Sequence, residues 1–415
     1  MFAPLNNAQA RTKEKVLYSF CSQANCADGD STEAGLIMDG AGNLYGTTEY
    51  GGGTGCQHGC GAVFKVTPKG KETVLYSFCS QANCTDGAEP VASLISDSGR
   101  DLYGTTIVGG ADGAGTVFKL TPSGQETVVY SFCSKTNCTD GSQPQAAVIT
   151  DGAGNFYGTT MEGGKGTACG GGGHPCGTVF KLTPGGSETV LYSFKGGRDG
   201  EYPEAGLIMD GAGNLYGTTS SGGATNDGTV FEVTAQGKET VLYSFCSLTG
   251  CADGGAPLAG LIADSSGNLY GTTWLGGTVN GNCSGGCGVV FELAPAAQGT
   301  PKAKETVLYS FAGGSDGSNP LAGLISDGSG NLYGTTEGTE GGTNGYGTVF
   351  EVTSNGQETV LYSFCSKANC IDGAEPDAGL ISNSAGNLYG TTRTGGNASC
   401  NGALGCGVVF KVTRK

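Results

Sequence analysis

Four short apolar strings return along the chain in a fixed order, each bounded by Gly, Asp, Asn or Pro. We call them strings A to D: A reads AGLIxD in variants, B reads NLYGTT, C reads GTVFKVT and D reads ETVLYSF. All four are rich in Val, Leu, Ile, Tyr, Phe and Thr, which is typical of β-strands. No segment of useful length shows apolar residues at helical spacing. The pattern therefore predicts an all-β protein.

Every string occurs seven times. Turn sequences such as DGAGN between A and B, and TPKGKE between C and D, predict tight hairpins. Each repeat is therefore expected to form one four-stranded antiparallel sheet, and seven such sheets predict a seven-bladed β-propeller. An open solenoid of seven units is the structural alternative, but no polar capping repeat is visible at either end.

The order of the strings predicts how the ring closes. The chain begins with a D string at 14–20 and ends with a C string at 407–413. We therefore expect the N-terminal strand to complete the last blade of a single domain over 14–413, flanked by tails at 1–13 and 414–415. The first tail contains Ala8-Gln9-Ala10, a pattern favoured at signal-peptide cleavage sites. We interpret it as the remnant of a secretory leader, with an ordinary disordered tail as the alternative.

Composition excludes two classes of protein. The formal net charge is −16, and the 21 basic residues are scattered, whereas a nucleic-acid binder needs a clustered basic face. No apolar run is long enough to span a membrane. The 80 glycines recur at fixed places beside the apolar strings, so we interpret them as turn residues of an ordered protein, expected to be a monomer.

The eighteen cysteines form nine close pairs with none left over. Structural zinc needs four Cys or His ligands, and the chain has only two histidines. A redox motif would be one Cys-x-x-Cys beside a helix, not nine pairs of varied spacing. We therefore interpret the pairs as local disulfides, with metal binding as the alternative. Disulfides at this density are typical of proteins outside the reducing cytosol, so we expect a secreted or extracytoplasmic protein, in the periplasm or at the cell surface.

The pairs fall in two kinds of connection. Five lie between strings D and A: Cys21–Cys26, Cys79–Cys84, Cys133–Cys138, Cys246–Cys251 and Cys365–Cys370. Four lie between strings B and C: Cys56–Cys60, Cys169–Cys176, Cys283–Cys287 and Cys400–Cys406. In a meandering blade, the D–A and B–C connections emerge together, and we call this side of the disc the loop face. Its loops are long and varied, as binding loops on a rigid scaffold usually are, so we expect any ligand there.

An Asp-Gly pair recurs in every D–A connection. Its aspartates are Asp28, Asp86, Asp140, Asp199, Asp253, Asp316 and Asp372. A ring of these carboxylates near the central channel would hold a divalent cation such as calcium, the one cofactor we consider. Alternatively, each Asp caps its own turn and the following Gly accepts a positive φ. Recurrence in every repeat favours the capping role.

The position after YGTT differs from repeat to repeat and so indicates recognition. Its occupants are Glu49, Ile107, Met161, Ser220, Trp274, Glu337 and Arg393. Trp274, the only Trp, would stack on a sugar ring at a loop mouth, with a packing role as the alternative. Three loop tyrosines carry the same two interpretations: Tyr50, Tyr202 and Tyr346.

Catalytic motifs are not evident. His58 and His174 lie in B–C connections, without a GxSxG motif, an HExxH motif or an unpaired cysteine. Acid–base chemistry by carboxylate pairs stays open, because Asp and Glu are abundant.

The combination GNLYGTTxxGG…GTVFKVTPxGxETVLYSF resembles the GloVer (Gloeo_Verruco) tandem repeat of bacterial secreted and surface proteins, over about residues 14 to 413. The resemblance implies an extracytoplasmic propeller. It implies no established activity, so no catalytic residue is carried over. The strings are also similar to other propeller repeats, which host both binders and enzymes.

These observations lead to three hypotheses. The first is a secreted binding or scaffold module whose loop face engages a glycan, a peptide or a cell-surface component. The second is a propeller enzyme, of the polysaccharide lyase, lactonase or glycosidase type, acting at the mouth of the central channel. The third is a structural spacer. An enzyme needs a few asymmetric polar groups that converge, whereas a spacer would show a symmetric rim.

Overall fold

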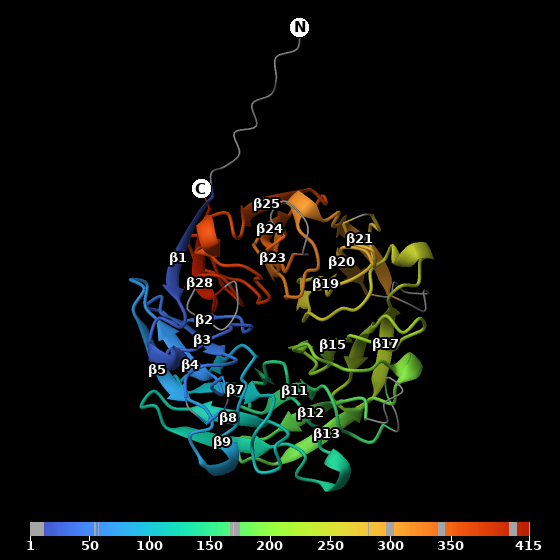
Figure 1. Cartoon of the computed structure of the whole chain (residues 1–415). Helices are drawn as coiled ribbons and strands as arrows, with labels where there is room; N and C mark the ends of the chain where they lie inside the picture. Colours follow the sequence, from blue (N-terminus) through green and yellow to red (C-terminus); the bar gives the residue numbers. More distant parts are fainter. Residues whose placement is uncertain are drawn as a thin grey trace.

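The computed structural model describes residues 12–53, 55–56, 58–166, 169, 175–280, 282–295, 303–338, 345–397 and 405–414. Seven four-stranded antiparallel sheets stand as blades around a common axis (Figure 1). The prediction of a seven-bladed β-propeller is confirmed. We number the blades along the chain, so that blade 1 contains β2 to β5 and blade 7 contains β26 to β28 together with β1.

Each blade is a meander of strands A, B, C and D, with A nearest the axis (Figure 1). The A strands are β2 (Ile37–Met38), β6 (Ile95–Ser96), β10 (Ile149–Thr150), β14 (Ile208–Met209), β18 (Ile262–Ala263), β22 (Ile325–Ser326) and β26 (Ile381–Ser382). The B strands are β3 (Leu44–Thr48), β7 (Leu102–Thr106), β11 (Phe156–Thr160), β15 (Leu215–Thr219), β19 (Leu269–Thr273), β23 (Leu332–Thr336) and β27 (Leu388–Thr392).

The two outer strands of each blade are longer on average. The C strands are β4 (Ala62–Val66), β8 (Thr116–Leu120), β12 (Thr178–Leu182), β16 (Thr229–Val233), β20 (Val289–Ala294), β24 (Thr348–Val352) and β28 (Val408–Thr413). The D strands are β5 (Glu72–Ser77), β9 (Glu126–Ser131), β13 (Glu188–Ser193), β17 (Glu239–Ser244), β21 (Lys304–Ser310), β25 (Glu358–Ser363) and β1 (Lys13–Ser19). Short 3-10 turns follow the D strands: η1 (Ala24–Cys26), η2 (Ala82–Cys84), η3 (Thr136–Cys138), η4 (Gly197–Asp199), η5 (Thr249–Cys251), η6 (Gly314–Asp316) and η7 (Ala368–Cys370).

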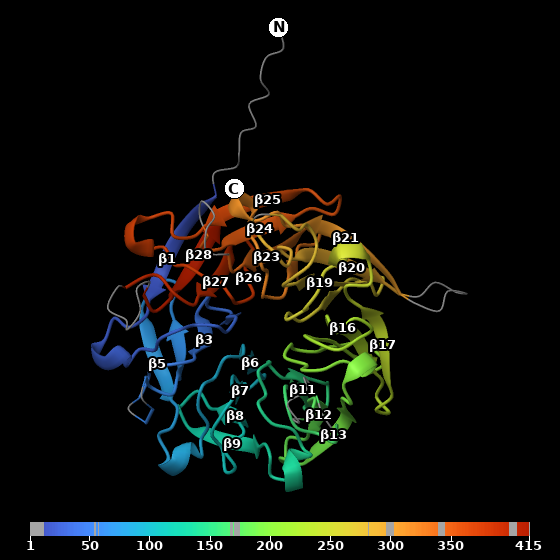
Figure 2. The same ribbon diagram turned by 45° about the vertical axis from the view of Figure 1, so that its right-hand side comes forward.

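The ring closes as the order of the strings predicts. Strand β1 pairs antiparallel with β28, and Val16 lies opposite Phe410. Figure 2 shows this first strand beside the last strands of the chain. A hydrogen bond from the Thr391 hydroxyl of blade 7 to the Ala34 carbonyl of blade 1, 2.9 Å long, closes the same seam nearer the axis. An open solenoid would have neither contact.

The apolar core lies between blades. The Phe of each D string packs edge-to-face on the Phe of the next blade's C string, as Phe20 does on Phe64 with Leu36 and Leu44 beside them. Ring centroids in the seven pairs are 4.9–5.1 Å apart. Each such pair contributes about 1 kcal/mol beyond the area it buries. A Cβ at Gly46 would lie 2.8 Å from Phe64 Cζ, which explains the glycine of string B.

A second interblade contact comes from the first Thr of YGTT. In every blade its hydroxyl donates to a backbone carbonyl just before the next blade's A strand, over 2.9–3.2 Å. The A strands themselves approach closely: a Cβ at Gly260 would lie 3.2 Å from the Gly206 carbonyl oxygen. Small residues are therefore needed at the axis, and the loop-face ends of neighbouring A and B strands lie side by side.

The face opposite the loop face is built from uniform turns. In the A–B turn of blade 3, the Asp151 carboxylate accepts the backbone N–H groups of Ala153 and Asn155 and the hydroxyl of Tyr157. The side-chain hydrogen bond from Asn155 is the largest cause that lowers the Asp151 pKa, to about 2. Across the described segments, no helix is long and apolar enough to cross a membrane.

Candidate functional site

The D–A and B–C connections meet on one face of the disc. The backbone of Asp30, in the D–A connection that leads into blade 1, pairs with Tyr50 in the B–C connection of that blade. The Gly52 N–H donates to the Cys26 carbonyl across the same contact. Equivalent bridges occur in five other blades: Ala88–Val108, Ser142–Glu162, Glu201–Ser221, Gly255–Leu275 and Ala374–Thr394.

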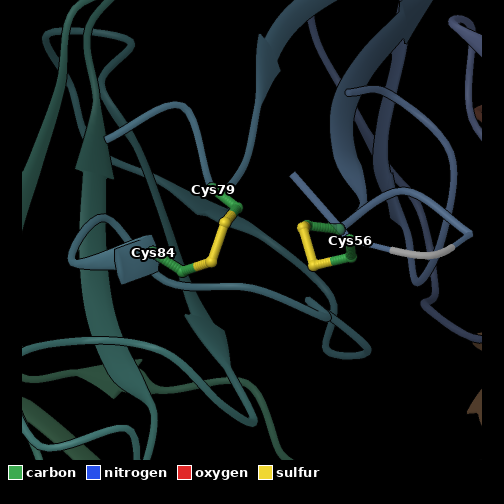
Figure 3. A group of neighbouring side chains, drawn as sticks. Cys56, Cys79 and Cys84 are labelled. Atoms are coloured by element: carbon green, nitrogen blue, oxygen red, sulfur yellow. A yellow bond between two sulfur atoms is a disulfide. The ribbon is translucent and has the colours of Figure 1, made fainter. Parts of the chain in front are cut away.

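Disulfides run along this loop face. Eight of the nine predicted pairs are bonded: Cys21–Cys26, Cys56–Cys60, Cys79–Cys84, Cys133–Cys138, Cys169–Cys176, Cys246–Cys251, Cys283–Cys287 and Cys365–Cys370. The ninth involves Cys400, outside the described residues. The bridge at Cys56 stands beside that joining Cys79 and Cys84 (Figure 3). Because disulfide sulfurs are not thiolates, this sulfur cluster is no zinc site.

The seven aspartates of the D–A connections lie at the outer strands and not at the axis. Asp28 is fully buried, and its carboxylate accepts the Tyr18 hydroxyl at 2.6 Å and the backbone N–H groups of Ser22 and Gln23. The tyrosine of every D string makes the equivalent bond, over 2.5–3.0 Å. These carboxylates are occupied by their own turns, which is the capping arrangement.

The donor sets for a metal ion are limited. Within the described residues, every group of three or more Cys, His, Asp or Glu atoms close enough for one ion includes disulfide-bonded cysteines. The aspartates proposed as a calcium ring are separated from one another by whole blades, each bonded within its own connection.

The four predicted aromatic residues do not form one cluster. Tyr50 is half-buried, with its ring 6.5 Å from that of His58. Tyr202 has a φ of 57° and donates its N–H to the Cys176 carbonyl. The carbonyl of Tyr346 accepts the N–H of Glu375. Each tyrosine therefore belongs to a different blade.

Trp274 lies where string B ends in blade 5. Its side chain is half-buried, and its backbone carbonyl accepts the Asn319 side-chain amide of blade 6 at 3.0 Å. The Trp274 side chain also faces Glu337 of blade 6. The predicted ligand aromatic therefore stands beside a carboxylate of the neighbouring blade.

Three positions per blade surround the axis on the loop face, and we call them the inner rim. The third position, after YGTT, donates its backbone N–H to the carbonyl of the first, over 2.8–3.2 Å in all seven blades. The first positions are Ser31, Glu89, Gln143, Tyr202, Ala256, Asn319 and Glu375. The second, just before string A, are Glu33, Val91, Gln145, Glu204, Leu258, Leu321 and Asp377. The backbone of the rim is symmetric, and its side chains are not.

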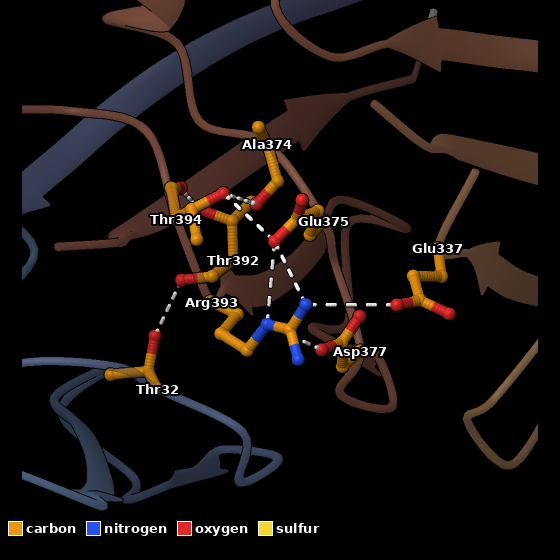
Figure 4. Close-up of polar contacts among 8 residues, drawn as sticks. All are labelled: Thr32, Glu337, Ala374, Glu375, Asp377, Thr392, Arg393 and Thr394. Atoms are coloured by element: carbon orange, nitrogen blue, oxygen red, sulfur yellow. Dashed lines mark hydrogen bonds and ion pairs between the residues drawn. The ribbon is translucent and has the colours of Figure 1, made fainter. Parts of the chain in front are cut away.

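The asymmetry concentrates around Arg393 of blade 7 (Figure 4). Its guanidinium lies 2.9 Å from Glu375 Oε2 and 3.2 Å from Asp377 Oδ2 in its own blade. It also lies 3.6 Å from Glu337 Oε1 of blade 6. Glu33 and Glu49 of blade 1 are close enough to interact electrostatically with this group. Three carboxylates from two blades therefore contact one cation, and two more carboxylates of blade 1 interact with it at longer range.

The electrostatics of this cluster follow from burial. Asp377 is deeply buried, which raises its pKa well above the usual value, although Arg393 opposes the rise. Asp377 Oδ1 has no hydrogen-bond partner. Burial also raises the pKa of Glu49, to about 7, and repulsion from Glu33 is the next cause. Burial raises the Glu337 pKa, with Arg393 as the main opposing influence.

The remaining rim positions are mainly apolar or neutral. Blade 2 has Val91 and Ile107 beside Glu89, whose pKa is raised by burial and by repulsion from Glu49, and Leu258 stands before string A in blade 5. In blade 4, the Ser220 hydroxyl donates to Glu204 Oε1 at 2.9 Å. The inner rim thus has an acidic arc over blades 6, 7 and 1 that continues to Glu89 of blade 2, and Trp274 stands at one end of that arc.

Part of this site was predictable from the sequence. The variable position after YGTT contains Glu49, Trp274, Glu337 and Arg393, all of which the structure places at the rim. Glu33, Glu375 and Asp377 were not predicted. Their signal was the same one, a departure between repeats, at the positions just before string A. His58 is exposed in its loop, and His174 lies outside the described residues.

The repeat family of the chain is shown by sequence. The Gloeobacter/Verrucomicrobia repeat matches residues 8–168, 165–337 and 277–415. The chain therefore belongs to this repeat family, as the resemblance predicted. A comparison with curated proteins finds no match.

Several solved structures are similar to this chain at low identity. A putative 6-phosphogluconolactonase from Bacteroides uniformis is 14% identical, with a TM-score of 0.45, covering 79% of this chain and 83% of its own. A luciferin-regenerating enzyme is 16% identical, with a TM-score of 0.42 over 77% and 90%. A putative gluconolactonase is 12% identical, with a TM-score of 0.38 over 72% and 81%. Similarity at this level carries no argument about activity.

Proposed function

We propose that this protein is a secreted binding module that recognises a glycan carrying positively charged amino sugars at the inner rim of its loop face. The observation that carries the proposal is the break in seven-fold symmetry. Trp274, Glu337, Arg393 and Asp377 come from three adjacent blades and converge on one arc of the rim. The eight disulfides fit an oxidising, extracytoplasmic setting, which supports secretion.

The charge of the arc supports a cationic ligand. Arg393 is the single basic residue among the rim positions, and five acidic side chains interact with it. Asp377 Oδ1 is buried without a partner, and such an orphaned acceptor is satisfied by an incoming N–H or O–H donor. The formal charge of −16 would also steer a cationic polymer toward the protein.

The aromatic residue supports a sugar. The apolar faces of pyranose rings pack on indole, and Trp274 presents a half-buried indole next to the Glu337 carboxylate. A single aromatic platform with carboxylates on one side suits a sugar whose ammonium group points toward the acidic arc.

Calorimetric titration with three tetrasaccharides tests the proposal. Tetraglucosamine, which is cationic, should bind more tightly than neutral tetra-N-acetylglucosamine, and anionic tetragalacturonate should bind least. The variant Trp274→Ala should weaken tetraglucosamine binding about tenfold, since a stacked ring contributes about 1 kcal/mol or more. Ile107→Ala, in the same rim position of blade 2, is the matched control and should bind as the wild type does. Equal binding of all three sugars, or an equal loss in both variants, would refute the proposal.

An enzymatic role is the second candidate, and one observation favours it. Glu49 has a pKa of about 7, raised by burial and by Glu33 beside it, and such a carboxyl can act as a general acid at neutral pH. If the protein cleaves the bound glycan, Glu49→Gln should abolish product formation, while tetraglucosamine still binds measurably, weakened by the loss of one carboxylate of the arc. Detection of intact tetraglucosamine alone, after prolonged incubation with wild-type protein, would exclude hydrolysis of this substrate.

A further inference from the structure

A groove lies on the outer edge of blade 3, at the D strand, whereas the inner rim lies at the loop-face ends of the A and B strands. The groove has a volume of about 620 Å³ and follows β13, the D strand, along its whole length. Residues of two connections complete the lining: Lys135 and Thr139 of the D–A connection that leads into blade 3, and Lys165 of the B–C connection of blade 3. Lys195, two residues after the end of the strand, also lines the groove.

Three lysines around one groove are unusual in a chain with 37 acidic and 21 basic residues. The Lys135 ammonium lies 2.6 Å from Glu188 Oε2, and the Lys195 ammonium lies 5.5 Å from the centre of the Tyr192 ring. Lys165 is exposed. Glu188 is the one carboxylate among the lining residues and pairs with Lys135, whereas Lys165 and Lys195 have no carboxylate partner in the lining; Lys195 interacts electrostatically with Glu239 of the next blade.

Comparison between repeats shows that this charge is specific to blade 3. Lys195 replaces the first cysteine of the D–A disulfide, a position held by Cys or Ala in the other repeats. The position of Lys165 is held by Gly53, Ala111, Ala224, Thr278 and Asn397 elsewhere. Lys135 recurs only as Lys367, which makes the same ion pair with Glu14 at 2.7 Å on the edge of blade 7. That second edge thus has one of the three lysines.

The strand in the groove sits at the edge of its sheet. Strand β13 pairs with β12 on one side only, and it lies on the periphery of the disc (Figure 1). Its outer backbone N–H and C=O groups can accept another strand, which is how many proteins bind extended peptides. Lysines on edge strands can also serve to prevent aggregation. That role would require similar lysines on every blade, whereas Lys165 and Lys195 have no equivalents.

We propose that this groove binds an extended acidic peptide segment, which adds to the outer edge of β13 and places its carboxylates on Lys135, Lys165 and Lys195. The backbone of the strand supplies main-chain hydrogen bonds, and Val190 and Leu191 supply apolar contact. The lysines select negative charge. This site is independent of the inner rim, because it uses other residues and a ligand of opposite charge.

The test uses a fluorescently labelled, end-blocked decapeptide of alternating Glu and Val, with fluorescence anisotropy as the readout. The double variant Lys165→Ala/Lys195→Ala should weaken binding by about tenfold or more, since each lost charge contact accounts for about 1 kcal/mol. Lys367→Ala is the matched control, because it removes the equivalent ion pair on blade 7 and should leave affinity unchanged. Binding should also weaken steeply with added salt.

Two further probes distinguish the class of ligand. The same peptide with its valine amides N-methylated should bind at least tenfold more weakly, because strand addition needs those N–H donors. A galacturonate decamer has the charge but no peptide backbone, and it should also bind more weakly. No binding of the Glu-Val peptide, an equal loss in the Lys367→Ala control, or tighter binding of galacturonate would each overturn the proposal. Circular dichroism of the variants checks that the fold is kept.

Discussion

The buried glutamates at the start of the D strands predict that acid stabilises this propeller. Glu126 of β9 is the clearest case, since neither of its carboxylate oxygens has a hydrogen-bond partner. Burial, with a smaller contribution from the negative charge of Asp86, raises the pKa of Glu126 to about 7. In the unfolded chain the same group titrates near its ordinary value, about 4.3. The folded state therefore binds a proton more tightly than the unfolded state does.

The direction of the pH effect on stability follows from this difference in pKa. The stabilisation from the protonated carboxyl is fully present below the unfolded pKa and is lost as the pH rises through about 7. A full change of this size would amount to almost 4 kcal/mol per glutamate, at about 1.4 kcal/mol per pKa unit. Because the group is only half-buried, solvent screening reduces the expected effect to about 1 kcal/mol. Glu72, Glu239, Glu305 and Glu358 have the same raised pKa, so their effects should add.

The perturbation is Glu126→Gln, which keeps the shape and removes the charge. Urea unfolding at pH 8, with the disulfides intact, should show the variant about 1 kcal/mol more stable than the wild type. At pH 4.5 the two should be nearly equal, because Glu126 is then neutral in the folded protein. Glu188→Gln is the matched control: Lys135 offsets part of the burial effect that raises the Glu188 pKa, so its substitution should give a smaller gain at pH 8. A Glu126→Gln variant that is less stable at pH 8, or equally shifted at both pH values, would refute the reasoning.

Three other predictions concern the ring and the rim. Thr391→Val removes the hydrogen bond to Ala34 at the closing seam and should lower the free energy of urea unfolding by about 1 kcal/mol. Thr218→Val at an internal seam should give the same loss, and a much smaller loss for Thr391→Val would argue against closure of the ring at that seam. Replacing both Cys79 and Cys84 by Ser should speed proteolytic cleavage between β5 and β6, as seen by mass spectrometry, because the bridge contributes about 2 kcal/mol, mostly to its own loop. The other blades should stay resistant, and new cleavage sites in them would contradict this prediction. Arg393→Met should destabilise the protein by about 1–3 kcal/mol at pH 7 and less at pH 4, because it leaves Glu375 and Asp377 without their cation; a loss independent of pH would count against the ion cluster.

The repeats made the fold predictable from sequence. Each string carries both its strand propensity and its interblade contact, because the same Phe of YSF and the same Thr of YGTT form every seam. A contact that recurs seven times leaves a seven-fold signal in the sequence. The closing pair of β1 with β28 followed from the order of the strings alone.

The candidate site was only partly predictable, for a physical reason. Its members belong to different blades, so Trp274 and Asp377 are far apart in sequence although both interact with Glu337. The sequence shows that the residue after YGTT differs between repeats. It does not show that the backbone hydrogen bonds of the rim place the charged residues at this position on one arc. The aspartates of the Asp-Gly pairs recur in every repeat, but they do not belong to the candidate site. Their strong recurrence reflects a turn that every blade needs, as the bond from Tyr18 to Asp28 illustrates.

The most direct test of the proposed function is a crystal structure of the protein with tetraglucosamine at saturating concentration. We predict one sugar ring stacked on the Trp274 indole, with an ammonium group within hydrogen-bond distance of Asp377 Oδ1. A tetrasaccharide bound on the opposite face of the disc, or an inner rim without sugar at that concentration, would contradict the account.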